Sequence, residues 1–294
     1  MSVEQKALDL DGISAIDVHV HIDVDDHGHA SLPDALMAGA HAHFQSSGGI
    51  PKLTEIAEYY RERSMAAVVF TVDSESVTGH RAISNDEIAD GAAANSDVLI
   101  PFGSIDPAKG DVAVTEARRL VTERGIRGFK LHPNLQAFFP NDRSVYPFYE
   151  EIQALQVPII FHTGQSGIGS GMRGAGGLRL KYSNPIHLDD VAVDFPDLRI
   201  IMAHPSFPWQ DEALAVATKN PNVYIDLSGW SPKYFPPNLV QYANSLLKER
   251  VLFGSDYPLL TPDRWIADFD KLEIKSDVRP MIMKQNAMRV LGLG

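Results

Sequence analysis

Two histidines separated by one residue, His19 and His21, lie in the segment AIDVHVHIDV at residues 15–24. In an extended strand successive side chains point to opposite faces, so these two imidazoles share one face, about 6 to 7 Å apart along the chain. Neutral imidazole is a common ligand of divalent metals. The flanking residues are apolar and β-branched, and a histidine without a partner would be costly to bury among them. The pair therefore predicts part of a metal site at the end of a buried strand.

Two further His-x-His pairs have a different setting. His27 and His29 lie in DDHGHAS, and His41 and His43 lie in MAGAHAHFQ. Both pairs stand among Asp, Gly, Ser and Ala, which is typical of loop or inserted sequence. We therefore expect neither of these two pairs to form the metal site.

Eight short segments rich in apolar and β-branched residues recur along the chain. Each is hydrophobic almost without a break, which is typical of parallel strands covered by helices on both faces. Amphipathic segments lie between them, and several begin with a good capping residue. The predicted strands span residues 13–22, 65–72, 97–105, 126–132, 157–164, 198–204, 222–230 and 250–258. The predicted helices span residues 53–63, 85–96, 111–125, 145–156, 187–195, 211–220 and 238–249.

This alternation favours an α/β fold of the (β/α)8 TIM barrel type. An open doubly wound sheet rarely has eight evenly spaced units, whereas a barrel requires them. We expect a single domain over residues 1–294. Two longer segments interrupt the alternation, residues 23–50 after the first strand and residues 165–185 after the fifth. Both leave the carboxyl ends of their strands, where barrel enzymes hold their sites, and we expect both to be inserted substrate loops.

The amino-acid composition limits the partners that the protein can bind and the chemistry that its side chains can perform. The chain has no cysteine, which excludes disulfides, thiolate catalysis and cysteine-bound zinc. Its formal charge is −12 and it has no run of basic residues, so a nucleic-acid or anionic-membrane surface is not expected. No apolar segment approaches the ~20 residues that span a bilayer, and the N-terminus has no signal-like apolar region. We expect a soluble cytoplasmic protein that acts on a small molecule.

Other polar residues occupy the ends of predicted strands, where valine or leucine would be the apolar default. A metal site explains them better than packing does, because bonds to a metal compensate the desolvation of imidazole and carboxylate. They are Lys130 and His132 on the fourth strand, His162 on the fifth, His204 on the sixth and Asp256 on the eighth.

These motifs resemble the amidohydrolase superfamily, and within it the branch related to aminocarboxymuconate-semialdehyde decarboxylase. DVHVH, GFKLHP, FHTG, MAHPS and GSDYP follow one another on the first, fourth, fifth, sixth and eighth predicted strands. The resemblance implies that His204 is a general acid or base beside the metal, and that Asp256 serves as ligand and proton acceptor. It implies one divalent metal ion, usually zinc and alternatively manganese, with four ligands: His19, His21, His162 and Asp256.

Four more residues are candidates for contact with the substrate, and each has a second interpretation. Lys130 is either a carbamylated bridge, as in two-metal members of the superfamily, or a cation paired with a substrate carboxylate or an aspartate. His132 is a substrate or outer-shell contact, or else structural. Arg173, in the glycine-rich segment, could grip a carboxylate with its guanidinium fork or lie in solvent. Trp230 could form the wall of an aromatic pocket or belong to the core.

For the activity, the resemblance first implies a metal-dependent hydrolase, in which a metal-bound water attacks the carbonyl of a small organic acid or acyl compound. The segments HTGQSGIGSGM and DLSGWSPKYF are similar to those of hydrolases of aryl β-ketoacyl thioesters in aromatic catabolism. The alternative is a non-oxidative decarboxylase of an aromatic or β-keto acid, in which His204 protonates the carbon that loses CO₂. A catalytically silent barrel is a third hypothesis, against which the complete ligand set argues. Relatives of this kind are often dimers, so a homodimer is expected.

Overall fold

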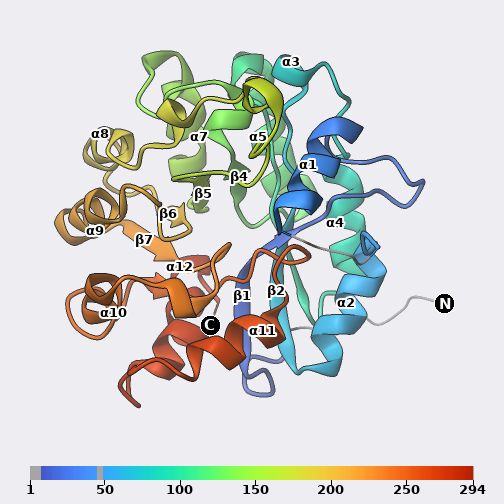
Figure 1. The fold of residues 1–294 in the computed structure, drawn as a ribbon. Helices are drawn as coiled ribbons and strands as arrows, with labels where there is room; N and C mark the ends of the chain where they lie inside the picture. The colour runs from blue at the N-terminus through green and yellow to red at the C-terminus, as the bar shows by residue number, and fades with distance from the viewer. Residues whose placement is uncertain (1–7, 45–48, 294) are drawn as a thin grey trace.

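Eight parallel strands form a closed barrel in the computed structural model, which describes residues 8–44 and 49–293 (Figure 1). The strands pair in the order β1-β2-β3 and β4 to β8. Single backbone bridges join Val20 to Tyr257 and Gly103 to Phe129, which closes the two sheets into one ring. The predicted (β/α)8 barrel is confirmed. The strands are β1 Ala15–His21, β2 Met65–Phe70, β3 Leu99–Pro101, β4 Phe129–Leu131, β5 Ile159–His162, β6 Ile200–Ala203, β7 Val223–Asp226 and β8 Val251–Leu252.

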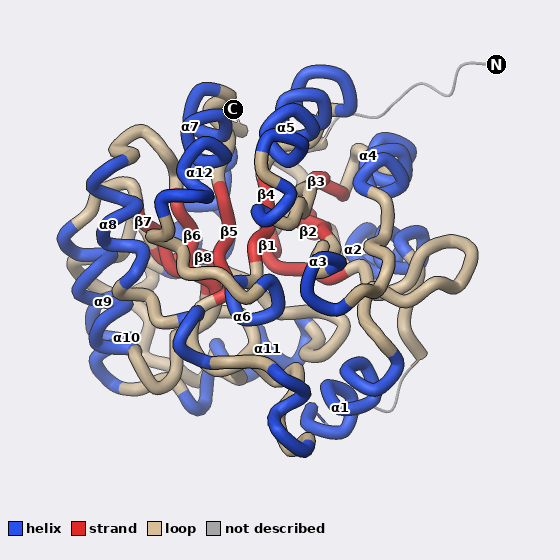
Figure 2. Tube along the Cα trace, turned by 90° about the horizontal axis from the view of Figure 1, so that it is seen from above, coloured by secondary structure: helices blue, strands red, loops and turns tan. Residues whose placement is uncertain are grey.

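Helices surround the strands, which occupy the middle of the molecule (Figure 2). Their ends follow local sequence signals: Ser84 caps α4 by accepting from the Asp86 N–H, and α5 ends at Gly125 with a φ of 74°. Among the described helices, none has the length and apolar character needed to cross a membrane. The helices are α1 Asp34–Phe44, α2 Leu53–Glu62, α3 Glu75–Thr78, α4 Asn85–Ala94, α5 Asp111–Arg124, α6 Pro133–Gln136, α7 Tyr146–Ala154, α8 His187–Asp194, α9 Gln210–Lys219, α10 Pro237–Ala243, α11 Pro262–Phe269 and α12 Asn286–Leu291.

Three predictions about the elements need correction. The segment 23–50, expected as a loop, contains α1, because Leu36, Met37 and Ala40 give it a buried face. The predicted helix 238–249 ends early, at Ala243 of α10. No helix was predicted after the eighth strand, where α11 and α12 lie.

The first strand changes its register around His19, the first of the two histidines. Its pairing with β2 shifts between Asp17 and Val20, as in a β-bulge. Ile16, before the shift, and Val18, within it, join one apolar cluster with Ile160 and other strand residues. Val20 packs in the other cluster, among the residues that lie between the strands and the surrounding helices. The bulge thus changes the direction of the side chains at the end of β1, where His19 and His21 follow the apolar residues.

Helix α11 is fixed to the barrel by Trp265. This side chain is fully buried, its Nε1–H donates to the Leu227 carbonyl at 3.0 Å, and its ring lies 4.7 Å from those of Phe253 and Phe269. We expect Trp265→Ala to lower the free energy of unfolding by about 3 to 5 kcal/mol, as for other large-to-small changes of a buried aromatic. Denaturant unfolding measures this loss. The control is Leu246→Ala, at an exposed position. A loss below about 1 kcal/mol for Trp265→Ala would show that Trp265 does not fix α11 to the barrel.

Candidate metal centre

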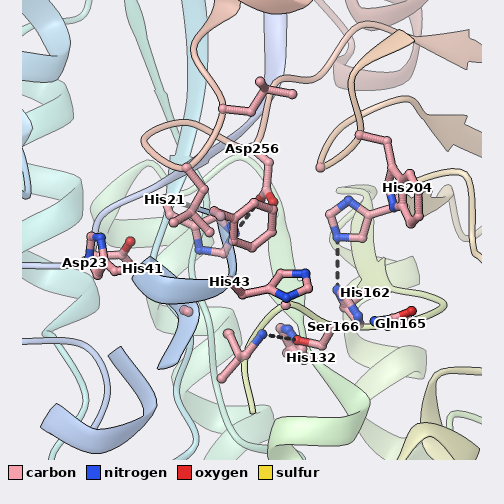
Figure 3. Close-up of a pocket in the computed structure, with 18 of the residues that line it drawn as sticks. His21, Asp23, His41, His43, His132, His162, Gln165, Ser166, His204 and Asp256 are labelled. Atoms are coloured by element: carbon pink, nitrogen blue, oxygen red, sulfur yellow. Dashed lines mark hydrogen bonds and ion pairs between the residues drawn. The ribbon is translucent and has the colours of Figure 1, made fainter. Parts of the chain in front are cut away.

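Three of the predicted ligands converge at the carboxyl end of the barrel. His19 and His21 place their Nε2 atoms 3.2 Å apart, and each of these atoms lies 3.2 Å from Oδ1 of Asp256. Figure 3 shows His21 and Asp256 side by side. The backbone holds the two ends of the group together, because the Asp256 N–H donates to the His19 carbonyl at 3.0 Å. Asp256 has a φ of 75°, an uncommon conformation for a residue with a side chain. Two imidazole nitrogens and one carboxylate oxygen therefore face a common point.

The chemistry of this donor set suits a divalent cation. Burial by itself would raise the pKa of Asp256, but hydrogen bonds from His19 and His21 hold that pKa well below its usual value. The carboxylate is therefore ionised, and it faces two rings that bring their lone pairs to the same point when they are neutral. Imidazole nitrogen and carboxylate oxygen are ligands of zinc, and they also occur in sites for other transition metals.

Asp226, to which the sequence interpretation gave no role, orients His19. Its Oδ2 accepts from Nδ1–H of His19 at 2.9 Å, and Ser228 Oγ lies 3.0 Å from the same nitrogen. With this tautomer the lone pair of His19 Nε2 faces the group, and Lys130 Nζ lies 3.1 Å from the same nitrogen. A carboxylate behind a metal-binding histidine fixes the ring and increases its basicity. The signal in the sequence was an aspartate in the apolar strand segment NVYIDLSGW.

We expect Asp226→Asn to weaken metal binding by about 10- to 100-fold, the range found for outer-shell partners of metal ligands. The amide can still accept a hydrogen bond but carries no charge to polarise His19. Competition with a chelator measures the affinity. Asp277→Asn, at an exposed position, is the matched control. Equal affinity in the Asp226→Asn variant and the control would show that Asp226 does not act through His19.

His162, the fourth predicted ligand, lies beside this group and outside the set of atoms within 4.8 Å of one another. Its Nδ1 is 3.0 Å from Nε2 of His204, and its Nε2 is buried without a hydrogen-bond partner among the described residues (Figure 3). With Nδ1 as the donor, the unpartnered Nε2 carries a lone pair, as a ligand must. Burial, followed by the nearby His132, keeps the pKa of His162 well below its usual value. These features are those of a metal ligand. That His162 binds the metal stays a prediction.

His204 is held by the segment that follows β7. Its Nδ1 lies 3.1 Å from the Ser228 carbonyl and 2.9 Å from Ser228 Oγ. A Cβ on Gly229, whose φ is 74°, would lie 2.6 Å from that nitrogen, so only glycine fits beside the ring. Burial lowers the pKa of His204 to about 4. Nε2 of His204 faces Nδ1 of His162 at 3.0 Å, and His204 lines the cavity described next.

A cavity of about 510 Å³ opens above these residues. His21, Asp256, His162, His132 and His204 line its polar end, and Figure 3 shows them around one space. The walls come from α1, the segment after β5 and the segments after β7 and β8. They include Met37, His41, His43, Phe44, Ser166, Ile168, Trp230, Tyr234, Leu260 and Arg264.

The other predicted contact residues are placed differently. Trp230 lines the cavity, as does His132, whose ring stacks on His162 at 4.0 Å. Lys130 is fully buried and does not line the cavity; its Nζ lies 3.1 Å from His19 Nε2, and burial lowers its pKa to about 8. Arg173 is exposed and lies outside the cavity wall. The structure thus does not bring Lys130 or Arg173 to the cavity surface.

The sequence interpretation also missed the second His-x-His pair as cavity residues. His41 and His43 lie at the end of α1 and line the cavity, because the inserted segment folds back over the barrel as a helix. No signal in the pair itself distinguishes it from the third pair. That pair, His27 and His29, is not part of the cavity wall.

Comparison with known proteins agrees with the fold and the motifs. The chain is 24% identical over 243 residues to 2-amino-3-carboxymuconate-6-semialdehyde decarboxylase of Dictyostelium discoideum, a match that covers 71% of this chain. It spans 65% of the length of that curated relative and 12% of another, protein fluG of Emericella nidulans. The resemblance to this branch of the superfamily is confirmed.

Solved structures share the architecture. An uncharacterized TIM-barrel protein from Bordetella bronchiseptica has a TM-score of 0.77 and 26% identity, over 95% of this chain and 98% of its own. A dihydroxybenzoic acid decarboxylase from Polaromonas, with bound manganese and the inhibitor 2-nitroresorcinol, has a TM-score of 0.67 and 18% identity, over 96% and 97% of the two chains. The family model described as Amidohydrolase matches residues 16–293, nearly the whole sequence, and the protein therefore belongs to the amidohydrolase family.

Proposed function

We propose that this protein is a metal-dependent decarboxylase of an aromatic or β-keto acid. The observation that carries the proposal is the position of His204, a buried imidazole that lines the same cavity as the His21 and Asp256 side chains of the three-residue group. The curated relative and the Polaromonas protein are both decarboxylases by name, which supports the proposal. Apolar and aromatic side chains on the cavity wall suit an aromatic body.

The chain would hold one divalent ion through His19, His21 and Asp256, with His162 as the fourth ligand. We propose zinc on the chemistry of the donor set, with manganese as the alternative, since manganese is bound in the Polaromonas protein. When bound, the ion supplies positive charge that orients an acid substrate and stabilises negative charge on its oxygens. Lys130, whose Nζ lies 3.1 Å from Nε2 of His19, is then a buried neighbour of the ligands.

His204 would supply the proton. Burial lowers the pKa of the imidazole to about 4, but an anionic substrate beside the ring would raise that pKa and favour the protonated form. On an aromatic acid, the proton passes from Nε2 to the trigonal ring carbon that bears the carboxylate. The bond to the carboxylate carbon then breaks, CO₂ leaves, and the electron pair of that bond remains with the substrate. Solvent returns a proton to His204.

The hydrolase is the second candidate, and it uses the same residues. It requires a group that removes a proton from water, for which Asp256 was predicted. In the structure hydrogen bonds with His19 and His21 hold the pKa of the Asp256 carboxyl well below its usual value, against the effect of burial. Two of the proteins named above, the Dictyostelium relative and the Polaromonas protein, are decarboxylases by name, and the decarboxylase is therefore the better supported of the two predictions.

One experiment distinguishes the two activities. Metal-loaded protein is incubated with a panel of hydroxybenzoic and β-keto acids in water labelled with heavy oxygen. For the decarboxylase we expect release of one CO₂ per product molecule and a solvent-derived hydrogen on the carbon that lost it. Label in the organic product without release of CO₂, from these acids or from an aryl β-ketoacyl thioester, would instead identify a hydrolase.

A further inference from the structure

One permanent cation lines the cavity of the metal centre. Among the described residues of its wall, Arg264 is the only lysine or arginine. Its guanidinium makes no ion pair or hydrogen bond with any described residue, whereas the adjacent Asp263 is paired with Arg63 at 2.8 Å. An arginine in this state is available to a ligand.

The backbone of Arg264 is firmly positioned. It lies in the first turn of α11, where its N–H donates to Oγ1 of Thr261 at 3.3 Å. The next residue, Trp265, anchors the helix in the core. The guanidinium therefore extends from a rigid element, as a residue that selects a ligand should.

The residues around it divide the cavity into three parts. Asp256 and His204 belong to the polar end, and Trp230 and Leu260 contribute apolar wall. Arg264 is exposed and so marks the solvent side. A matching ligand has an acidic head at the metal centre, an apolar body and a tail that suits a guanidinium.

The net charge of the protein is negative, which favours a ligand-binding role for the Arg264 cation. The chain has a formal charge of −12, and the carboxylates of Asp23 and Asp256 line the cavity. A ligand with two negative groups would be repelled by this field unless local positive charge met each group. The metal centre would meet the first group. Arg264 is positioned to meet the second.

We propose that Arg264 binds a second carboxylate, so that the substrate is a dicarboxylic acid with its reacting carboxylate at the metal centre and the other at the cavity rim. The proposal rests on the proposed function. A guanidinium can accept a carboxylate with two parallel hydrogen bonds, which gives both affinity and orientation. The role that the sequence suggested for Arg173 thus belongs to Arg264, which lines the cavity.

Ligand binding tests this without turnover. The probes are salicylate and a series in which a second carboxylate stands opposite the first on the ring, attached directly or through one or two methylene groups. A second series carries an uncharged carboxamide in place of the added carboxylate. Calorimetry on metal-loaded protein gives the dissociation constants. The variants are Arg264→Gln, Arg264→Lys and the control Arg127→Gln, which changes an exposed arginine between α5 and β4.

We expect at least one dicarboxylate to bind about tenfold more tightly than its carboxamide twin, the scale of a charge-assisted hydrogen bond. Arg264→Gln should remove this advantage and leave the affinity for salicylate unchanged. Arg264→Lys should retain part of it, and Arg127→Gln all of it.

Two results would overturn the inference. In the first, no dicarboxylate binds better than its carboxamide twin. In the second, the advantage persists in Arg264→Gln. Both results concern only the second carboxylate of the ligand. The proposed decarboxylase activity is tested independently, by the release of CO₂.

Discussion

Asp256→Asn is expected to abolish stable metal binding. The change keeps the size of the side chain but removes the negative charge that faces the Nε2 atoms of His19 and His21 at 3.2 Å. We expect the metal affinity to fall by more than the about 100-fold that marks the upper range for outer-shell partners. Elemental analysis should find about one divalent ion per chain in the unaltered protein and almost none in the variant. Activity should fall to background.

The matched control is Asp23→Asn, which alters another aspartate of the cavity that stands outside the three-residue group. It should keep its metal. Circular dichroism should show that both variants remain folded. If the Asp256→Asn protein retained a full complement of metal, the ligand set assigned to this centre would be wrong. About two ions per chain in the unaltered protein would instead revive the carbamylated Lys130 bridge.

His204→Gln is expected to separate catalysis from metal binding. The imidazole would donate the proton to the substrate, and loss of a general acid typically lowers the rate by about 10²- to 10⁴-fold. Glutamine retains hydrogen-bonding capacity toward Ser228 but cannot shuttle a proton. The metal content should stay close to that of the unaltered protein, because His204 is not one of the four proposed ligands. Steady-state kinetics and elemental analysis on one preparation measure both quantities.

His187→Gln is a suitable control for this prediction, since His187 opens α8 and its ring packs against Phe139 at 5.0 Å. It should leave the rate unchanged. Loss of metal from His204→Gln would show that His204 is a ligand or supports one, and an unchanged rate would exclude it as the acid.

The barrel and the polar ends of its strands could be predicted because both rest on local sequence. Near-continuous apolar segments indicate buried parallel strands, and His19, His21 and Asp256 interrupt such segments where only a partner could offset their desolvation. The structure brings these three side chains together as that physical argument requires. His162 was predicted by the same argument and lies next to them.

Features that depend on how distant segments fold together could not be predicted. Asp226 looks like any strand aspartate until the barrel places it against His19, 207 residues away. His43 looked like loop sequence until α1 folded over the cavity. Arg173 and Arg264 have the same side chain, and only tertiary placement shows that one lines the cavity and the other lies outside it.

The closure of the barrel also has a consequence for how the chain matures. Val20 of β1 meets Tyr257 beyond β8, and the buried Asp17 accepts from the hydroxyl of Ser255, 238 residues later. The metal centre spans this seam between the first and the last strand. A growing polypeptide therefore has no complete ligand set until its final strand has been synthesised and docked. An ion that binds only the closed barrel stabilises it by mass action. Metal uptake would therefore indicate that the barrel has closed, and it would also stabilise the folded protein.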